Sequence, residues 1–312
     1  MNKFDANQWA VILGGSSGFG LAAAAKLAQE GMSVLIVHRD RRGAMRRIEP
    51  EFEKIRAHGQ ALVTLNLDAL SDAGRERVVD ALKENLGADG KVRVLMHSIA
   101  FGNLKPVAPA VPDTRVADAV AALANKLGVE AEAVQTAVGE LLADGAAPLH
   151  TLSEAQYGDA LIEAEDMERT IFSMGTSFLT WVQALHGAGL FAADARVLGM
   201  TSEGNEVAWK GYAAVAAAKV ALESVSRAIA VEFGPHGIRS NIIQAGVTPT
   251  PALALIPGSA KMQAVAQMRN PLGRTTTPED VADFIALMCT DEAAWVNGSI
   301  LRVDGGEHIA SL

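Results

Sequence analysis

The chain has 312 residues, of which 49% are hydrophobic and 20% charged, so it can bury a sizeable core and is not disordered as a whole. Its 27 basic and 36 acidic residues give a net charge of −9 and a pI near 5.3, which argues against nucleic acid or an anionic membrane surface as a partner. The single cysteine, Cys289, excludes an internal disulfide, and no cysteine and histidine stand at zinc spacing. We see no signal peptide and no apolar stretch of membrane length. These features predict a cytoplasmic protein without a bound metal.

Short apolar runs alternate with helix-length segments over most of the chain. Strands are predicted at Trp9–Leu13, Val34–Val37, Ala61–Leu67, Val92–Met96, Arg196–Met200, Arg239–Gln244 and Ser299–Val303. Helices are predicted at Leu21–Gln29, Met45–His58, Asp72–Leu86, Met167–Gly187 and Tyr212–Phe233. Buried runs of about five residues separated by helices of about 10 to 15 are typical of βαβ units. The pattern predicts an α/β fold, a Rossmann-like doubly wound parallel sheet of seven strands in the order 3-2-1-4-5-6-7, with residues 1–312 as one domain.

A segment of about 103–163, after the fourth strand, interrupts this alternation. Two amphipathic helices are predicted there, Asp113–Leu127 and Glu130–Leu142. Their expected apolar stripes are Val116, Val120, Leu123 and Leu127 on the first, and Val134, Val138 and Leu141 on the second. This helical insertion falls at the carboxyl edge of the sheet, where open α/β folds bind ligands. It is either an exposed hairpin that supports a neighbouring element or a lid or docking platform over the substrate mouth.

A glycine-rich turn lies directly between the first strand and the helix that follows it. Its residues expected to bind a cofactor are Gly14, Ser16, Ser17, Gly18, Phe19 and Gly20. Glycines there let the backbone turn tightly and approach a pyrophosphate, which rests on the positive end of the next helix. Glycines also serve in plain turns, but the strand–turn–helix context favours dinucleotide binding.

The end of the second strand bears on the choice of cofactor. Arginines stand at three of the four positions 39–42, and we expect Arg39 and Arg42 to bind the 2′-phosphate of NADPH, which a guanidinium suits and a carboxylate repels. Asp40 points the other way, and such a charge run also occurs at a solvated helix start. NADPH is favoured over NADH. Asp68, after the third strand, is placed to meet the adenine or to cap the following helix.

Several motifs together resemble the short-chain dehydrogenase/reductase superfamily, over nearly the whole chain apart from the insertion. They are the glycine turn, the helix with Tyr212 and Lys219, Ile238–Ile242 before Ala245 and Gly246, Pro271–Arg274, and Val303–Gly306. Within that superfamily the chain most resembles the divergent enoyl-acyl-carrier-protein reductases. Ser98, Ile99 and Ala100 follow His97 where Asn-Asn-Ala-Gly is usual, and Tyr212 precedes Lys219 by seven positions rather than four.

The seven-residue spacing has a physical meaning on a helix. Seven residues are nearly two turns, so Tyr212 and Lys219 would share a face, about 10.5 Å apart along the axis. The position four before Lys219 is Val215, which cannot donate a proton. Reduction of ketones by the usual tyrosine–lysine pair is therefore disfavoured, although two such residues can also share a helix by coincidence.

The resemblance implies a reaction and a set of roles. The reaction is reduction of the 2,3-double bond of an enoyl thioester, with Tyr212 donating a hydrogen bond to the enolate oxygen. Lys219 would hold the nicotinamide ribose and lower the pKa of Tyr212. Further cofactor contacts are implied at Ser98, Ile99, Ala100, Gly246, Val247 and Thr250. The segment Thr248–Met268 resembles the mobile cover of an acyl chain.

The chain also departs from the common enoyl reductases. The second tyrosine, ten residues before the catalytic one, is Ser202 here, and Met167–Gly187 lacks the asparagine of the superfamily's catalytic tetrad. The tight glycine turn and the arginines resemble the NADPH-dependent branch. The resemblance implies an acyl carrier protein as the substrate's carrier and a homotetramer, with Phe178 and Trp181 as candidate contacts. A reductase of free carbonyl or ene compounds and a non-catalytic NADPH-binding sensor or scaffold are the alternatives.

Overall fold

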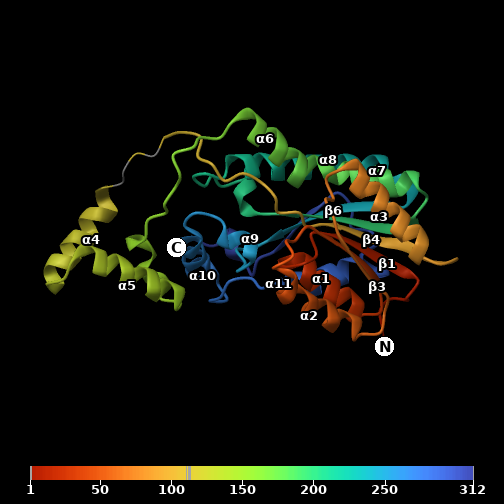
Figure 1. Cartoon of the computed structure of the whole chain (residues 1–312), viewed down its shortest axis with the longest axis horizontal. Coiled ribbons are helices and arrows are strands. Elements are labelled where there is room, and N and C mark those ends of the chain that lie inside the picture. The colour runs from red at the N-terminus through yellow and green to blue at the C-terminus, as the bar shows by residue number, and fades with distance from the viewer. Residues whose placement is uncertain (1, 110, 112–113, 312) are drawn as a thin grey trace.

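The computed structural model describes residues 2–109, 111 and 114–311, and these residues form a seven-stranded sheet in which every neighbouring pair of strands is parallel (Figure 1). The strands are β1 (Gln8–Leu13), β2 (Ser33–His38), β3 (Leu62–Asn66), β4 (Lys91–His97), β5 (Phe191–Thr201), β6 (Ile238–Ala245) and β7 (Ile300–Val303). Their order is β3-β2-β1-β4-β5-β6-β7, so the predicted fold is confirmed.

Helices cover both faces of the sheet because successive strand residues point to opposite sides. On β1, Ala10 and Ile12 belong to one apolar cluster, whereas Trp9, Val11 and Leu13 belong to the other. The first cluster is closed by α1 (Gly18–Gln29), α2 (Met45–Arg56) and α11 (Pro278–Met288). The second is closed by α3 (Asp72–Asn85), α7 (Ser177–Gly187) and α8 (Ala213–Glu232). Figure 1 shows these groups on opposite sides of the sheet.

Two predicted helices differ from their expected form. The segment expected as one helix over 167–187 consists of α6 (Ala164–Ile171), a π-helical turn (Phe172–Thr176) and α7. Tyr212 is the N-cap of α8 and does not lie within the helix. Its carbonyl oxygen still accepts a hydrogen bond from the N–H of Ala216 at 2.9 Å, so the helix begins one residue later than predicted. Phe178 and Trp181 are wholly buried, so they belong to the core and not to a subunit contact.

The insertion forms its own small apolar cluster away from the sheet (Figure 1). It contains α4 (Thr114–Leu127), α5 (Ala131–Ala143) and a 3-10 turn (Ala147–Leu152). The buried residues of the two helices are Val120, Ala124, Val134, Val138 and Leu142. Leu123, Leu127 and Leu141 of the predicted stripes are exposed instead, because the contact face lies one residue further along at Ala124 and Leu142. Asp113, the predicted start of the first helix, lies outside the described residues.

The segment predicted over Thr248–Met268 contains α9 (Pro251–Ala254) and α10 (Ser259–Arg269). In Figure 1 both helices lie between the sheet and the insertion. Across the described residues, no helix combines the length and apolar character that a membrane span needs.

Candidate active site

A cleft of about 480 Å³ opens at the carboxyl ends of the strands. Residues that follow β1 and β4 line this cleft. The strand order reverses between these two strands, and this is where open α/β sheets bind their ligands. The predicted site residues that line it are Gly14, Ser16, Ser17, Gly18, Phe19, Arg39, Asp68, Ser98, Ile99, Ala100, Tyr212, Lys219, Gly246, Val247 and Thr250. Gly20 and Arg42 do not line it. The fold thus gathers most of the predicted residues into a single cleft.

The glycine turn is shaped so that only glycine fits at its critical positions. Gly14 has φ +85°, and a Cβ there would lie 2.5 Å from the carbonyl oxygen of Ser98 at the end of β4. A Cβ on Gly20 would lie 2.2 Å from the carbonyl oxygen of Gly14. Gly14 therefore lets the end of β1 approach the end of β4 at the bottom of the cleft. Gly20 lets α1 pack against the glycine turn. Gly20 supports the site from below rather than lining it.

The beginning of α1 fits a pyrophosphate. Ser17 is the N-cap, yet among the described residues no side chain caps this helix, and its first turn contains no acidic residue. By contrast, Ser71 caps α3 and Thr277 caps α11 through hydrogen bonds from backbone N–H groups. The uncapped N–H groups and the positive end of the helix dipole are suited to hold an anion. The residues present therefore fit a dinucleotide cofactor.

At the end of the cleft beside β2, Arg39 lines the cleft, whereas the side chain of Asp40 lies outside it. Arg39 forms an ion pair with Asp68 at 3.3 Å and lies 4.4 Å from the centre of the Phe101 ring. The Asp40 carboxylate is 3.0 Å from Nδ1 of the buried His38 and is not part of the cleft lining. Of the two charged residues that directly follow β2, the guanidinium of Arg39 lines the cleft and the carboxylate of Asp40 does not, while the Asp68 carboxylate after β3 lines the cleft as the partner of Arg39.

Tyr212 lies at the apolar end of the cleft. Its hydroxyl oxygen is 3.3 Å from Oγ of Ser202, and a Cβ on Gly204 would lie 2.4 Å from its ring. Burial raises the pKa of Tyr212, and the hydrogen bond with Ser202 offsets part of that rise. The expectation that Lys219 lowers the pKa of Tyr212 is wrong, because burial raises this pKa and the opposing contribution comes from Ser202. Tyr212 thus keeps its proton at neutral pH and can act as a hydrogen-bond donor.

Lys219 is buried on α8 and donates to the carbonyl oxygen of Met200 at 2.8 Å. Burial lowers its pKa to about 8, while the charge of Glu223, one turn later, works in the opposite direction. Glu223 accepts hydrogen bonds from Thr201 and Asn205, both at 2.6 Å. Glu223 therefore ties the loop after β5 to α8 and helps to keep Lys219 charged.

A buried histidine at the end of β4 stays neutral. Burial, aided by the charge of Lys219, lowers the pKa of His97 to about 3. Its Nε2 is 2.9 Å from the hydroxyl of Ser177 on α7. His97 holds the strand end against the helix and is not a proton donor at neutral pH.

An apolar wall surrounds the reacting end, and the sequence predicted only the part of it that lies in the segment Thr248–Met268. It is formed by Phe101, Leu104, Met174, Trp209, Val215, Leu253, Ile256 and Met262. The segment with Phe101 and Leu104 is held by α6 and the π-helical turn. Ser173 of the turn donates to the carbonyl oxygen of Phe101, and Thr170 of α6 accepts from the N–H of Asn103 at 3.0 Å. These residues come from segments far apart in the chain, so no local pattern marks them.

A buried carboxylate, Glu307, and a partly buried arginine support the loop after β6. The carboxylate of Glu307 accepts a hydrogen bond from the backbone N–H of Val247 at 3.1 Å and forms an ion pair with Arg269 of α10 at 3.2 Å. Arg269 also contacts Glu203, which lines the cleft, at 2.6 Å. Burial raises the pKa of Glu307, although Val247 and Arg269 both favour its charged form. No sequence pattern connects these residues, because they lie far apart in the chain.

Comparisons with known families agree with this geometry. The family model described as "Enoyl-(Acyl carrier protein) reductase" matches residues 141–308, more than half of the chain, and the model described as "short chain dehydrogenase" matches residues 8–122. The chain belongs to the short-chain dehydrogenase/reductase superfamily. It is therefore an NAD(P)H-dependent oxidoreductase of the enoyl reductase-like type.

Its relatives carry several activities. A probable 2,4-dienoyl-CoA reductase of Bacillus subtilis is 27% identical over 301 residues, 96% of each chain. The cis-4-hydroxycyclohexanecarboxylate dehydrogenase of Sinomonas cyclohexanicum is 30% identical over 190 residues, 61% of this chain and 72% of that protein. The NADH-dependent enoyl-acyl-carrier-protein reductase of Escherichia coli is 38% identical over 109 residues, 35% of this chain and 42% of its own length.

Solved structures share the fold. The enoyl-acyl-carrier-protein reductase of Aquifex aeolicus superposes with a TM-score of 0.70 at 22% identity, covering 98% of both chains. A short-chain dehydrogenase of Burkholderia cenocepacia in complex with NADP superposes with a TM-score of 0.68 at 20% identity, covering 98% of this chain and 99% of that one.

Proposed function

We propose that this protein uses NADPH to reduce the carbon–carbon double bond of an enoyl thioester. The observation that carries the proposal is that Tyr212 and Lys219 face one apolar cleft, while Val215 stands at the position four before Lys219. A tyrosine so placed can meet the oxygen of a thioester. The enoyl reductase family match over residues 141–308 supports the same reaction.

The reaction balances with the residues at hand. NADPH, held by the glycine turn and Lys219, would provide the hydride that the β-carbon receives. The double bond then breaks, its electrons move to the thioester oxygen as an enolate, and the α-carbon takes a proton from solvent. Tyr212, kept protonated by burial, donates a hydrogen bond to the enolate oxygen. Lys219 holds the nicotinamide ribose, and its charge favours the developing anion. The apolar wall lowers the polarity around the enolate oxygen and so strengthens both interactions.

The choice of NADPH rests on the end of β2. Arg39 lines the cleft, whereas the Asp40 carboxylate is directed to His38. A guanidinium can pair with a 2′-phosphate, and Arg39, half exposed in its ion pair with Asp68, would exchange that carboxylate for the phosphate. We therefore place the 2′-phosphate near Arg39. Arg42 is exposed and outside the cleft, so it has at most a long-range attraction for the phosphate.

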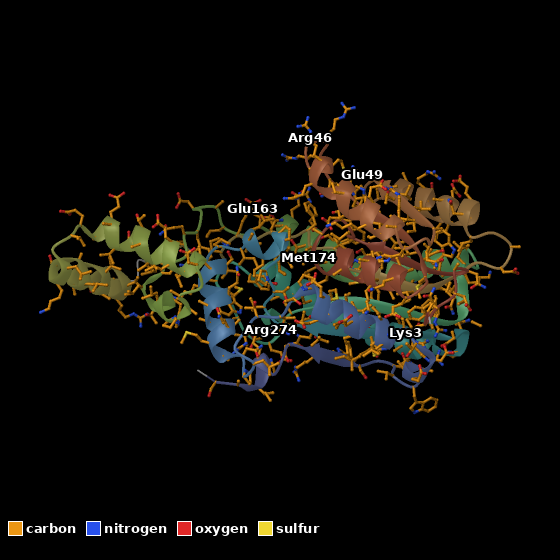
Figure 2. All side chains as sticks on the ribbon, turned by 90° about the horizontal axis from the view of Figure 1, so that it is seen from below. Lys3, Arg46, Glu49, Glu163, Met174 and Arg274 are labelled. Atoms are coloured by element: carbon orange, nitrogen blue, oxygen red, sulfur yellow. The ribbon has the colours of Figure 1, made fainter. Side chains whose placement is uncertain are left out.

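We propose an acyl carrier protein as the carrier, docked at the adenosine side. Residues 103–163 carry nine acidic and three basic residues, a net charge of −6 out of −9, and would repel an acidic carrier. Arg41, Arg42, Arg46 and Arg47 are exposed, and none of the four forms an ion pair within the described chain. Figure 2 shows Arg46 projecting from the surface at the beginning of α2. These arginines would attract such a carrier.

We also propose a homotetramer, because the part of the chain that forms the sheet and its flanking helices has exposed apolar side chains. Val220 and Val231 of α8 and Trp295 before β7 are exposed, Trp295 by 97%. Subunit contacts would remove them from water. Light scattering of the purified chain tests this assembly.

Reduction of a free carbonyl compound is the second candidate. The hydrogen bond between Ser202 and Tyr212 favours it, because a paired serine and tyrosine can also polarise a ketone. The dehydrogenase relative from Sinomonas is consistent with such chemistry.

Oxidation of NADPH by the purified protein tests the two candidates together. Crotonyl thioesters of coenzyme A and of acyl carrier protein are compared with acetoacetyl thioester and a free ketone, with NADH as the cofactor control. Turnover of the enoyl substrates alone supports the proposal, whereas turnover of the ketones alone would replace it with the second candidate. An Arg46→Glu variant that slows only the carrier-protein substrate would support the docking side.

A further inference from the structure

Helix α10 stands between the apolar end of the cleft and the insertion. Met262 lines the cleft, whereas Ala264, two residues later, is buried in the apolar cluster of the insertion. Residues two apart on a helix point to nearly opposite sides, so the two faces of α10 have different neighbours. A shift of the helix toward one side must therefore change the space on the other.

The insertion holds α10 at several points along its length. Ala264 packs in the cluster that contains Val138 of α5, and Lys261 donates to the carbonyl oxygen of Ser153 at 3.3 Å. At the beginning of α10, a Cβ on Gly258 would lie 2.8 Å from the side chain of Ala155. Figure 1 shows the insertion beyond α10, on the side away from the sheet. These contacts fix both the start and the middle of the helix.

The carboxyl end of α10 is held from the opposite side. Arg269 reaches Glu203 and Glu307, and Glu307 in turn accepts the N–H of Val247. The same helix is therefore tied to the loops that follow β5 and β6, which carry the groups at the reacting end. Its position relative to Tyr212 is set by contacts at both ends.

Within the described residues, the lining of the cleft includes no residue of 114–152. Any influence of the insertion on the substrate must then pass through the helix that it holds. α10 supplies Met262, and the adjoining α9 and the turn after it supply Leu253 and Ile256 to the apolar wall. The acyl chain of a thioester would extend along this wall.

We propose that the insertion is a specificity-determining element: by holding α10 it sets the depth of the acyl pocket and so limits the length of chain that is reduced. This inference rests on the enoyl-thioester activity proposed above. The insertion acts as a fixed support behind a wall of the pocket. An α10 released from it moves outward and admits longer chains.

Substitution of Ala264 by Asp tests the proposal. A carboxylate in the apolar cluster should detach α10 from the insertion, because a buried unpaired charge is costly. The matched control is Ala260→Asp, which places the same charge on an exposed position of the same helix. For both, kcat/KM is measured with crotonyl and dodecenoyl thioesters and NADPH. Val138→Ala, which removes methyl groups from the same contact without adding charge, covers the case in which Ala264→Asp does not fold.

Three results decide between the possibilities. We expect Ala264→Asp to raise the dodecenoyl-to-crotonyl ratio of kcat/KM about ten-fold, and Val138→Ala about three-fold, since a few methylenes of pocket depth change discrimination by this order. Ala260→Asp should leave the ratio unchanged. If the dodecenoyl-to-crotonyl ratio is unchanged in the folded variants, or if kcat/KM falls equally with both substrates, the insertion has no role in chain-length specificity. The proposed reductase activity would still stand. A wild-type protein that reduces neither thioester overturns the proposed activity and this inference with it.

Discussion

The hydroxyl oxygens of Tyr212 and Ser202 lie 3.3 Å apart, so the serine ten residues before the tyrosine is its hydrogen-bond partner. Ser202 stands at the beginning of the loop after β5, and Gly204 in the same loop leaves room for the tyrosine ring. The loop is fixed in turn by Glu223, through Thr201 and Asn205. Tyr212 is therefore positioned by two segments at once, the loop after β5 and the start of α8.

Replacing Tyr212 by Phe should lower kcat for the enoyl substrate by about 100-fold and leave NADPH binding unchanged. The variant keeps the ring and loses the donor, and the loss of one donor to a developing oxyanion costs about this factor. The matched control is Tyr157→Phe, which changes the other tyrosine of the chain, outside the cleft lining. Steady-state kinetics with fluorescence titration of NADPH measures both quantities. Unchanged kcat in Tyr212→Phe would remove the catalytic assignment.

The activity should fall as the pH rises through about 8. Burial lowers the pKa of Lys219 to about 8, so its charged form is lost above that pH. The pH profile of kcat/KM reports the pKa values of groups in the free enzyme. The descending limb, the fall in activity above about pH 8, should therefore appear in this profile. Glu223→Gln removes the charge that raises the pKa of Lys219, so the limb should move to lower pH. Glu232→Gln, at the exposed end of the same helix, is the control and should not move it.

The fold was predictable because its signals are local and repeated. Each strand is a short apolar run, and the glycine turn marks where β1 meets α1, so the pattern indicates a doubly wound sheet, whose usual strand order is the one observed. The cleft residues at 98–100, 246, 247 and 250 were expected from the family resemblance, whereas the glycine turn, Arg39 and Asp68 were predictable from the pattern itself. They follow strand ends, and parallel strands bring their carboxyl ends to one edge.

The remaining parts of the site depend on contacts that no local pattern encodes. The predicted insertion stripes missed Ala124, since a small residue marks the contact face less clearly than Leu123 does. The π-helical turn after α6 resembles an ordinary helix in sequence. The pairing of Arg269 with Glu307 joins positions 38 residues apart on different elements, and only the tertiary structure shows it.

Removal of the Arg39 side chain should weaken NADPH binding by about 20-fold and leave NADH binding almost unchanged. Charge-assisted hydrogen bonds to a phosphate contribute on this order, and NADH lacks the 2′-phosphate. Arg39→Met is compared with Arg77→Met, an exposed arginine of α3 on the same protein. Titration of each variant with both cofactors gives the ratio of dissociation constants. Equal weakening for NADPH and NADH would place the 2′-phosphate elsewhere or show that NADH is the natural cofactor.

Replacing Arg269 by Met should lower kcat/KM for the enoyl substrate by about ten-fold. The change leaves Glu307, which is 2% exposed as a side chain, without its cation, and so loosens the loop with Val247. Arg269→Lys should restore part of the activity because it keeps the charge. Arg274→Met is the control, since its ion pair with Asp280 lies at an exposed helix end. If Arg269→Met and Arg274→Met behave alike, the contact between α10 and the loops has no part in catalysis.

Asp194 should contribute strongly to the free energy of unfolding. It lies near the beginning of β5, at the amino ends of the strands and so opposite the cleft. Its carboxylate accepts from Arg93, Arg239 and the wholly buried Arg196. Burial works to raise the pKa of Asp194, but the hydrogen bond from Arg196 and the charges of all three arginines outweigh it, and the pKa lies below its ordinary value. Asp194→Asn should therefore lower the free energy of unfolding by about 3 kcal/mol at neutral pH, because it leaves buried cations without their partner.

The contribution of Asp194 should be complete above its ordinary pKa of 3.8 and lost as the pH falls through the lowered one. Urea unfolding at neutral pH measures the main effect, and acid titration of the wild type follows the loss. Asp283→Asn is the matched control, because Asp283 pairs with Lys26 while 65% exposed and should cost less than about 0.5 kcal/mol. Equal losses in the two variants would mean that the three arginines are satisfied by backbone carbonyl groups, such as those of Cys289 and Met288, without the carboxylate.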